Sequence, residues 1–308
     1  MLVRVSACGV CRTDLHIVEG ELSPMRPSIV PGHQVVGRVE RAGPNAHRFR
    51  PGDRVGVAWL RATCGACESC RAGRENLCER AEFTGYHADG GFADYAIVDE
   101  RFAYAIPSVF GDAEAAPLLC AGAIGHRALR LTGLADGGAL GLMGFGASAH
   151  LVLQLARHVH PRSKIAVFAR EPQARAFALS LGADWAGASD ARPPFPLTAI
   201  IDTTPAWKPV VDALARLAPG GRLVINAIRK EDADKPALLG LSYHDHLWME
   251  REVKTVANLT GRDIEEFLAI AAAIPIRPVV TTYPLADANR ALRELRAGGG
   301  TGAKVLIP

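Results

Sequence analysis

Hydrophobic and polar residues follow two different rhythms along the chain, and the change between them falls near residue 121. Before that point, short apolar runs are separated by pairs of turn-forming residues. These pairs are Pro31-Gly32, Pro51-Gly52 and Gly90-Gly91. Short runs with such turns are typical of small β-sheets, so we expect residues 1–120 to form a rolled, antiparallel β domain.

From residue 121 onward, apolar strand-like runs alternate with amphipathic helical patterns. The predicted strands cover residues 139–145, 164–169, 198–204 and 222–228, and the predicted helices cover residues 148–159, 172–183 and 208–221. Alternation of this kind predicts an α/β fold with a doubly wound parallel sheet of the Rossmann type. After it come helical patterns at residues 263–273 and 286–297 and a last strand at residues 303–308.

Composition narrows the class of protein. The 308 residues are 49% hydrophobic, which is enough for a large core and two domains. A net charge of +3 is too small and diffuse to predict binding to nucleic acid or to a membrane surface. The sequence has neither a signal peptide nor an apolar run of the roughly 18 residues that a membrane span needs. Together with the clustered cysteines, this predicts a protein of the reducing cytoplasm.

Four of the seven cysteines lie close together, with the spacing Cys-x2-Cys-x2-Cys-x7-Cys. They are Cys64, Cys67, Cys70 and Cys78. Four thiolates complete the closed tetrahedral shell of a structural zinc ion, and close spacing lowers the entropy lost when the loop closes. Two disulfides or an iron–sulfur cluster are the alternatives, but the rest of the sequence favours structural zinc.

A second set of possible metal ligands is dispersed along the chain. It consists of Cys11 in "SACGVCRTDLH", His33 in "VPGHQVV" and Cys120 in "APLLCAGA". Two thiolates and one imidazole that converge in the fold leave a fourth position open for water or substrate, as in a catalytic zinc site. Taken singly, Cys120 is equally well read as a buried core cysteine, and His33 as a histidine satisfied in a turn.

A glycine-rich turn opens the predicted helix at residues 148–159. Gly144, Gly146 and Ala149 form G-x-G-x-x-A directly after a predicted strand. The first glycine permits a tight turn, the second lets the backbone approach a pyrophosphate, and the alanine allows close packing of helix and sheet. The motif is weak alone, but in this context it predicts a dinucleotide site.

Taken in order, these motifs resemble the zinc-dependent medium-chain alcohol dehydrogenases. The resemblance runs from Val3 to the C-terminus and includes "CGVCRTDLH", "PGH", the four-cysteine run, "DGGFADYAIV" and "LLCAG". It implies a GroES-like antiparallel β-barrel catalytic domain over residues 1–120 and 258–308 and a Rossmann domain over residues 121–257. It also implies two zinc ions, NAD or NADP, a small alcohol or aldehyde as substrate, and a homodimer or homotetramer. Members of the family carry a further segment before the strand that begins here at Leu2, so we expect an N-terminally short member.

The resemblance assigns roles to the residues that follow Cys11. Arg12 would lie beside the cofactor pyrophosphate, and Asp14 would orient His33 by accepting its second N–H. Thr13 would take the proton of the alcohol and pass it, through the cofactor ribose, to His16 and then to solvent. A capping aspartate and a surface histidine are the plainer interpretations of Asp14 and His16.

Three further residues complete the comparison. Trp59 matches an aromatic wall of the substrate pocket, with core packing as the alternative. Many relatives carry glutamate where this chain has Gln34, which leaves the step of ligand exchange at the metal in doubt. Cys8 forms Cys-x-x-Cys with Cys11, but no thioredoxin pattern surrounds it, so we expect Cys8 to be a small buried residue.

The choice of cofactor depends on the end of the second strand of the Rossmann domain. NAD-specific sites place an acidic residue there, which binds the ribose 2′-hydroxyl and repels a 2′-phosphate. Here Ala169 occupies that position, followed by Arg170 and Glu171. The sequence therefore favours NADP(H), with Arg170 as the phosphate ligand, although Glu171 could instead serve the ribose of NAD(H).

Two rival functions remain open at this level. A quinone or enoyl-type reductase of the same superfamily would lack the dispersed zinc ligands, which this chain has. A metal-binding relative without activity would not need Thr13, His16 or the glycine-rich turn.

Overall fold

The computed structural model describes residues 1–274, 276–298 and 300–308, and the chain divides into two compact units. Unit 1 contains Met1–Ala123 and Asn258–Pro308, and unit 2 contains Ile124–Ala257. Within the described residues, no helix is both long and apolar enough to cross a bilayer.

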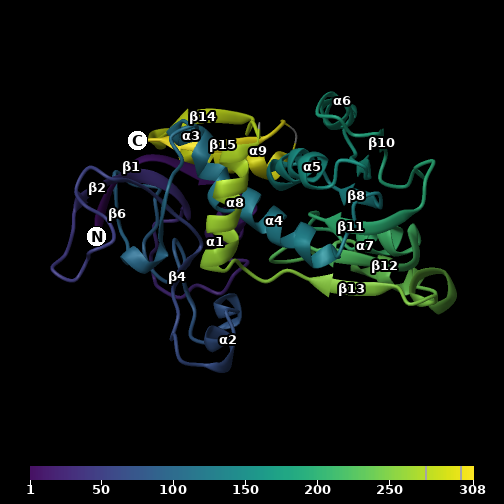
Figure 1. The fold of residues 1–308 in the computed structure, drawn as a ribbon, viewed down its shortest axis with the longest axis horizontal. Coiled ribbons are helices and arrows are strands. Elements are labelled where there is room, and N and C mark those ends of the chain that lie inside the picture. Colours follow the sequence, from purple (N-terminus) through teal and green to yellow (C-terminus); the bar gives the residue numbers. More distant parts are fainter. Residues whose placement is uncertain (275, 299) are drawn as a thin grey trace. The chain divides into compact units, whose positions relative to one another are not determined.

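Unit 1 is built on a largely antiparallel sheet whose described strands run in the order β14-β15-β1-β2-β3-β7, with β6 also paired to β1. These strands are β1 (Leu2–Val10), β2 (Gln34–Arg41), β3 (Arg54–Val57), β6 (Tyr95–Ile97), β7 (Ala103–Ala105), β14 (Val280–Pro284) and β15 (Ala303–Ile307). A separate pair is formed by β4 (Leu60–Ala62) and β5 (Glu82–Phe83). The C-terminal strand β15 pairs with the N-terminal strand β1, so the two ends of the chain share one sheet (Figure 1).

Short helices and a valine-rich core complete unit 1. Its helices are α1 (Arg12–Val18), α2 (Glu68–Arg71), α3 (Asp112–Ala115), α8 (Gly261–Ala273) and α9 (Ala288–Ala297), and α4 (Ala121–Thr132) begins in unit 1 and continues into unit 2. Val3, Val35, Val55 and Val57 pack together under the sheet with almost no exposure. This core anchors β1 and β2, whose C-terminal and N-terminal ends carry Cys11 and His33.

Unit 2 is a six-stranded parallel sheet in the order β10-β9-β8-β11-β12-β13 among the described residues. Its strands are β8 (Ala139–Met143), β9 (Lys164–Phe168), β10 (Trp185–Gly187), β11 (Leu197–Asp202), β12 (Leu217–Ile225) and β13 (Glu252–Thr255), and its helices are α5 (Ala147–Val159), α6 (Pro172–Ser180) and α7 (Lys208–Leu214). The order reverses beside β8, so the loop between β8 and α5 lies at the topological switch point. The predicted Rossmann-type sheet is confirmed.

The structure corrects several details of the predicted elements. The helix expected over residues 208–221 ends at Leu214, because Leu217 already begins β12 and pairs with Leu197 of β11. The strands β10, β13 and β14 were not predicted. Each is at most five residues long and lacks the run of buried apolar residues that identifies a buried strand.

Candidate metal centres and nucleotide turn

The three dispersed ligands of the sequence analysis converge in unit 1. The Sγ atoms of Cys11 and Cys120 and a ring nitrogen of His33 lie within 4.8 Å of one another. Cys11 Sγ is 3.4 Å from His33 Nε2. Two such ligands of a tetrahedral zinc ion would be separated by about 3.6 Å, given the usual Zn–S and Zn–N bond lengths. The donor set and its spacing therefore fit zinc, with a fourth position left for another ligand.

Local helix capping places Cys11. It is the N-cap of α1, where its Sγ accepts a hydrogen bond from the backbone N–H of Thr13 at 3.4 Å. Asp14, in the third position of the helix, accepts from the backbone N–H of Cys11 at 2.9 Å. This reciprocal capping box fixes the position of Cys11 at the N-terminus of α1, and its hydrogen bonds form without a metal ion.

Asp14 also holds the histidine. Its Oδ1 lies 3.0 Å from His33 Nδ1 and accepts from the backbone N–H of Gly32 at 3.1 Å. Both side chains are buried, with exposed fractions of 0% for Asp14 and 1% for His33. When Nδ1 donates to Asp14, the lone pair of Nε2 faces Cys11, which is the tautomer a metal requires.

The charge state of Cys11 suits metal binding. Its pKa lies well below the ordinary value, chiefly because of a hydrogen bond with Cys120, and this outweighs the effect of burial. Cys8 behaves differently. Burial raises its pKa well above the ordinary value, and its side chain is 0% exposed, so the expectation of a small buried residue is confirmed.

The four clustered cysteines form a second group of potential ligands, with all four Sγ atoms within 4.8 Å of one another. Cys64 Sγ lies 3.8 Å from Cys70 Sγ and 3.5 Å from Cys78 Sγ. Tetrahedral zinc thiolates are about 3.8 Å apart, whereas a disulfide needs about 2.05 Å. All four thiols are free, so the disulfide alternative is excluded. Hydrogen bonds from the backbone N–H groups of Ala66 and Cys67 lower the pKa of Cys64 to about 5.

The predicted proton-relay residues both belong to α1. Thr13 is half-buried at its first turn. His16 lies one turn further on and is only 2% exposed, with its Nδ1 in contact with Glu21 Oε2. The plainer interpretation of His16 as a surface histidine is therefore wrong, and a carboxylate that sequence analysis missed lies next to its ring.

An aromatic cluster lies beside His33. The Trp59 ring meets the His33 ring edge-on with centroids 4.9 Å apart, and it stacks on Phe83 at 4.9 Å. Trp59 Nε1 donates to Asn258 Oδ1 at 3.0 Å. Trp59 is thus fixed on three sides beside His33 and is only 6% exposed, so core packing accounts for its contacts as well as a place in a pocket wall does.

Gln34 is buried, with an exposed fraction of 2%. It faces Gly9 across the β1–β2 pair, and a methyl group added at Gly9 would come within 2.5 Å of its Oε1. The absence of a side chain at Gly9 therefore provides the space for the Gln34 amide.

The glycine-rich turn of unit 2 has the features that a dinucleotide needs. Gly144 adopts φ +83°, a left-handed conformation that favours glycine, and a Cβ there would lie 3.0 Å from Thr203 Oγ1. A Cβ on Gly146 would meet nothing within 4 Å, so the backbone there borders open space. Ala149 is 1% exposed against the sheet. The N-terminus of α5 thus presents N–H groups at an accessible turn.

Sequence analysis also missed the ion pair that secures this turn. Lys230 Nζ contacts Asp202 Oδ2 and donates to the carbonyl oxygens of Thr204 at 2.7 Å and Ala206 at 3.0 Å. The side chains of Lys230 and Asp202 are 8% and 0% exposed. The pair holds the loop after β11 in the place where it packs on Gly144. In the sequence, the pair is signalled by Asp202, a charged residue at the end of an otherwise largely apolar strand.

Of the remaining predicted residues, Arg12 and Arg170 are partly or fully accessible and Ala169 is buried. Arg12 is half-buried at the start of α1, and Arg170 is exposed after β9. Ala169 is 5% exposed and donates its backbone N–H to Gly187 at 3.0 Å.

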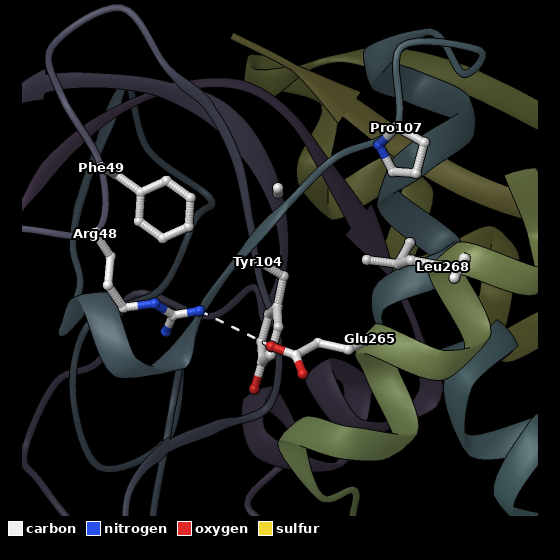
Figure 2. Close-up of a pocket in the computed structure, with 8 residues that line it drawn as sticks. Arg48, Phe49, Tyr104, Pro107, Glu265 and Leu268 are labelled. Atoms are coloured by element: carbon white, nitrogen blue, oxygen red, sulfur yellow. Dashed lines mark ion pairs between the residues drawn. The ribbon is translucent and has the colours of Figure 1, made fainter.

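A separate hollow of about 480 Å³ in unit 1 contains none of these residues (Figure 2). Arg48 and Glu265 form an ion pair at 3.8 Å, and Tyr104 lines the same hollow. Burial raises the pKa of Tyr104, so its hydroxyl stays protonated. Among the described residues, the two groups of potential metal ligands lie outside this hollow, and we assign it no part in the chemistry.

Comparison with known proteins identifies the family. Residues 1–108 match the model of the alcohol dehydrogenase GroES-like domain. Over its whole length, the chain is 46% identical to the probable alcohol dehydrogenase AdhA of Mycobacterium tuberculosis (strain CDC 1551 / Oshkosh), of which it covers 88%. The chain belongs to the zinc-dependent medium-chain alcohol dehydrogenase family.

Solved structures agree with this assignment. The chain resembles the cinnamyl alcohol dehydrogenase SbCAD4 of Sorghum bicolor with a TM-score of 0.87 and 28% identity, covering 99% of this chain and 89% of that one. It also resembles a protein of Sinorhizobium meliloti 1021, described as a zinc-binding dehydrogenase bound to NADP. There the TM-score is 0.86 and the identity 26%, with 100% of this chain and 92% of that one covered. The predicted combination of a GroES-like and a Rossmann domain is confirmed.

Proposed function

We propose that this protein is a zinc- and NAD(P)-dependent alcohol dehydrogenase that interconverts small alcohols with aldehydes or ketones. The observation that carries the proposal is the convergence of Cys11, His33 and Cys120, which leaves one ligand position open. In a superfamily that also contains reductases without zinc ligands, this donor set favours the alcohol dehydrogenase reaction.

Cys11, His33 and Cys120 would hold the catalytic zinc, and Asp14 would keep His33 in the required tautomer. Cys64, Cys67, Cys70 and Cys78 would hold a structural zinc. When bound, the catalytic zinc supplies a Lewis acid for the substrate oxygen, and the nicotinamide cofactor supplies the hydride donor or acceptor.

The residues of α1 would handle the proton. During alcohol oxidation, Thr13 would accept the hydroxyl proton of the substrate at Oγ1, and His16 would carry a proton outward from its inward-facing ring nitrogen. Trp59, fixed beside His33, would form an apolar wall that favours uncharged substrates.

Gly144, Gly146 and Ala149 would receive the pyrophosphate, and Arg12 would add a positive charge beside it. We favour NADP(H) over NAD(H). Ala169 leaves no carboxylate to repel a 2′-phosphate, and the exposed Arg170 next to it has a guanidinium that suits one.

We propose further that two copies pair through β13, the last described strand of the sheet in unit 2. Its backbone edge is free to pair with another strand, and exposed apolar side chains lie on it and before it: Leu247, Trp248, Met249 and Val253. Sedimentation of the parent and of Val253→Lys tests the pairing. A fall to half the mass in the variant is expected, and an unchanged mass would refute it.

The function is tested by measuring zinc content together with oxidation of NADPH and NADH over a panel of aldehydes and ketones. We expect zinc in the purified protein, reduction of at least one carbonyl class, and loss of that activity on chelation. A zinc-free protein that reduces an activated C=C bond instead would support the rival reductase. A zinc-loaded protein that binds cofactor but turns over no member of the panel would support the inactive relative.

A further inference from the structure

The carboxyl ends of three neighbouring strands meet at one edge of the sheet in unit 2. These strands are β8, β11 and β12, and the order of the sheet reverses beside β8. In open α/β sheets, ligands bind in the crevice outside the carboxyl ends of the strands at such a reversal. The loops that follow β8, β11 and β12 are therefore the ones that shape the proposed nucleotide site.

The loop after β11 forms one side of the glycine-rich turn. Thr203 donates its backbone N–H and its hydroxyl to the carbonyl oxygen of Met143, at 3.0 Å and 3.1 Å. A Cβ on Gly144 would lie 3.0 Å from Thr203 Oγ1 and 3.1 Å from Thr204 Cγ2. A shift of these two threonines would change the space in which Gly144 makes its left-handed turn.

A second loop, which follows β12, holds the first one in place. The N–H of Glu231 donates to the carbonyl oxygen of Pro205 at 2.7 Å. Asp234 accepts the N–H groups of Trp207 at 2.9 Å and of Lys208 at 2.8 Å. The two loops are therefore joined by hydrogen bonds and would move together.

Lys230 supplies a buried charge between these loops. Its Nζ contacts Asp202 Oδ2 and donates to the carbonyl oxygens of Thr204 and Ala206, at 2.7 Å and 3.0 Å. An ammonium has three donors, and the three acceptors here come from the end of β11 and the loop that follows it. The other oxygen of Asp202 accepts the N–H and the hydroxyl of Thr204, at 3.0 Å and 2.7 Å.

Stability alone does not explain this ion pair. The side chains of Lys230 and Asp202 are 8% and 0% exposed. Two charges taken out of water lose most of what their attraction returns, and apolar residues of similar volume often stabilise a fold as well or better. A buried ion pair instead imposes one geometry, because both charges lose their partners if the loop moves.

We propose that Lys230 is a positioning residue for the cofactor, which holds the loop after β11 in the conformation that receives the pyrophosphate at Gly144 and Gly146. The identity of the ligand rests on the proposed function, whereas the order of the loop does not depend on it. If the loop keeps this conformation in only about one molecule in ten, the apparent Kd for the cofactor rises about tenfold.

The first test follows the loop without a cofactor. Hydrogen exchange of the backbone N–H groups of Thr203 and Thr204 measures how often the loop opens. We expect about tenfold faster exchange in Lys230→Met than in the parent, and parent-like exchange in Lys235→Met. Lys235 is the matched control, because it pairs with Asp232 on the same loop while both side chains are exposed. Equal exchange in Lys230→Met and the parent would overturn the inference.

The second test separates positioning from stability. Lys230→Met leaves a buried carboxylate without its counter-charge, so this variant should lose stability. The double variant Lys230→Met with Asp202→Asn removes both charges, and the asparagine oxygen can still accept from Thr204. We expect its Tm to approach that of the parent. Its Kd for NADPH should stay raised about tenfold, because the carbonyl oxygens of Thr204 and Ala206 still lack their donor. A double variant that regains both Tm and affinity would make the pair purely structural and refute the inference.

Cofactor binding keeps this inference apart from the proposed function. NADPH and NADH are titrated by fluorescence into the parent, Lys230→Met, the double variant and Lys235→Met. We expect weaker binding in Lys230→Met and in the double variant, and parent-like binding in Lys235→Met. A parent that binds neither nucleotide would refute the proposed function and this inference together, whereas equal binding by the parent and all variants would refute this inference alone.

Discussion

Asp14 Oδ1 lies 3.0 Å from His33 Nδ1, and both residues are almost completely buried. The same carboxylate accepts the backbone N–H of Cys11, so one side chain contacts two of the three proposed ligands. The arrangement makes Asp14 a support for the site as a whole, because its loss would free both the histidine ring and the helix cap.

Replacement of Asp14 tests that support. We expect Asp14→Asn to weaken zinc binding at the Cys11 site by about 10- to 100-fold, because an amide cannot hold the His33 tautomer as a carboxylate does. The measurement is zinc release to a chromogenic chelator. The four-cysteine site serves as an internal control and should keep its zinc. Equal release from both sites, or no change at either, would contradict the prediction.

Cys67→Ser tests the role of the four-cysteine site. Cys67 is the N-cap of α2 and accepts from the backbone N–H of Cys70 at 3.5 Å. Serine is also a good N-cap, so the substitution removes a zinc ligand but keeps the cap. We expect the loss of one zinc ion and a lower Tm, with turnover per folded molecule largely kept.

The matched control for that experiment is Ser69→Ala in the same helix, which should leave zinc content and Tm unchanged. Loss of turnover in Cys67→Ser at a temperature where the protein is still folded would contradict a purely structural role.

His150 predicts a pH dependence of stability. It is buried in α5 and its Nδ1 lies 3.2 Å from the carbonyl oxygen of Gly146, while burial lowers its pKa to about 4. Between pH 6.5 and 4, His150 is therefore protonated in the unfolded chain but remains neutral in the folded chain. Stability falls as pH falls through this window, by at most about 1.4 kcal/mol per unit.

His150→Leu removes this proton uptake. We expect the unfolding free energy of the variant relative to the parent to rise by about 2 kcal/mol between pH 7 and pH 5, as measured by denaturant titration. The exposed His158→Leu, at the end of the same helix, should show no such change. Parallel pH profiles for His150→Leu and the parent would show that His150 does not titrate as described.

Arg170→Ala tests the choice of cofactor. A charge-assisted contact with a 2′-phosphate contributes about 1.5–3 kcal/mol, or roughly ten- to a hundredfold in binding. We expect the parent to prefer NADPH in kcat/KM and the variant to lose that preference, while Arg192→Ala keeps it. A parent that prefers NADH, with an unchanged ratio in the variant, would show that Arg170 does not recognise phosphate.

Spacing along the chain was enough to predict the cluster of four cysteines and the glycine-rich turn. Four cysteines within a short loop, or glycines at fixed intervals after a strand, specify a local geometry. That geometry does not depend on how the rest of the chain folds. Cys120 depended on the family resemblance, since a single cysteine in an apolar run carries no sign of its partners.

The contacts that sequence analysis missed join residues that follow no regular spacing along the chain. Glu21 reaches His16 only because Gly20 reverses the chain, and a glutamate after a glycine resembles any exposed loop. Lys230 meets Asp202 across neighbouring strands, which requires the strand order to be known. In both cases the signal is a charged side chain that turns out to meet a buried partner.

The most direct test of the account is the zinc content and turnover of Cys120→Ser beside the parent. Cys120 follows the short turn Ala116–Leu119 and is one of the three converging ligands, remote in sequence from the four-cysteine loop. We predict two zinc ions per chain in the parent and one in the variant, with a nearly unchanged Tm and no measurable alcohol oxidation. A variant that keeps both zinc ions, or that loses one and still turns over at the rate of the parent, would contradict the assignment of the catalytic site.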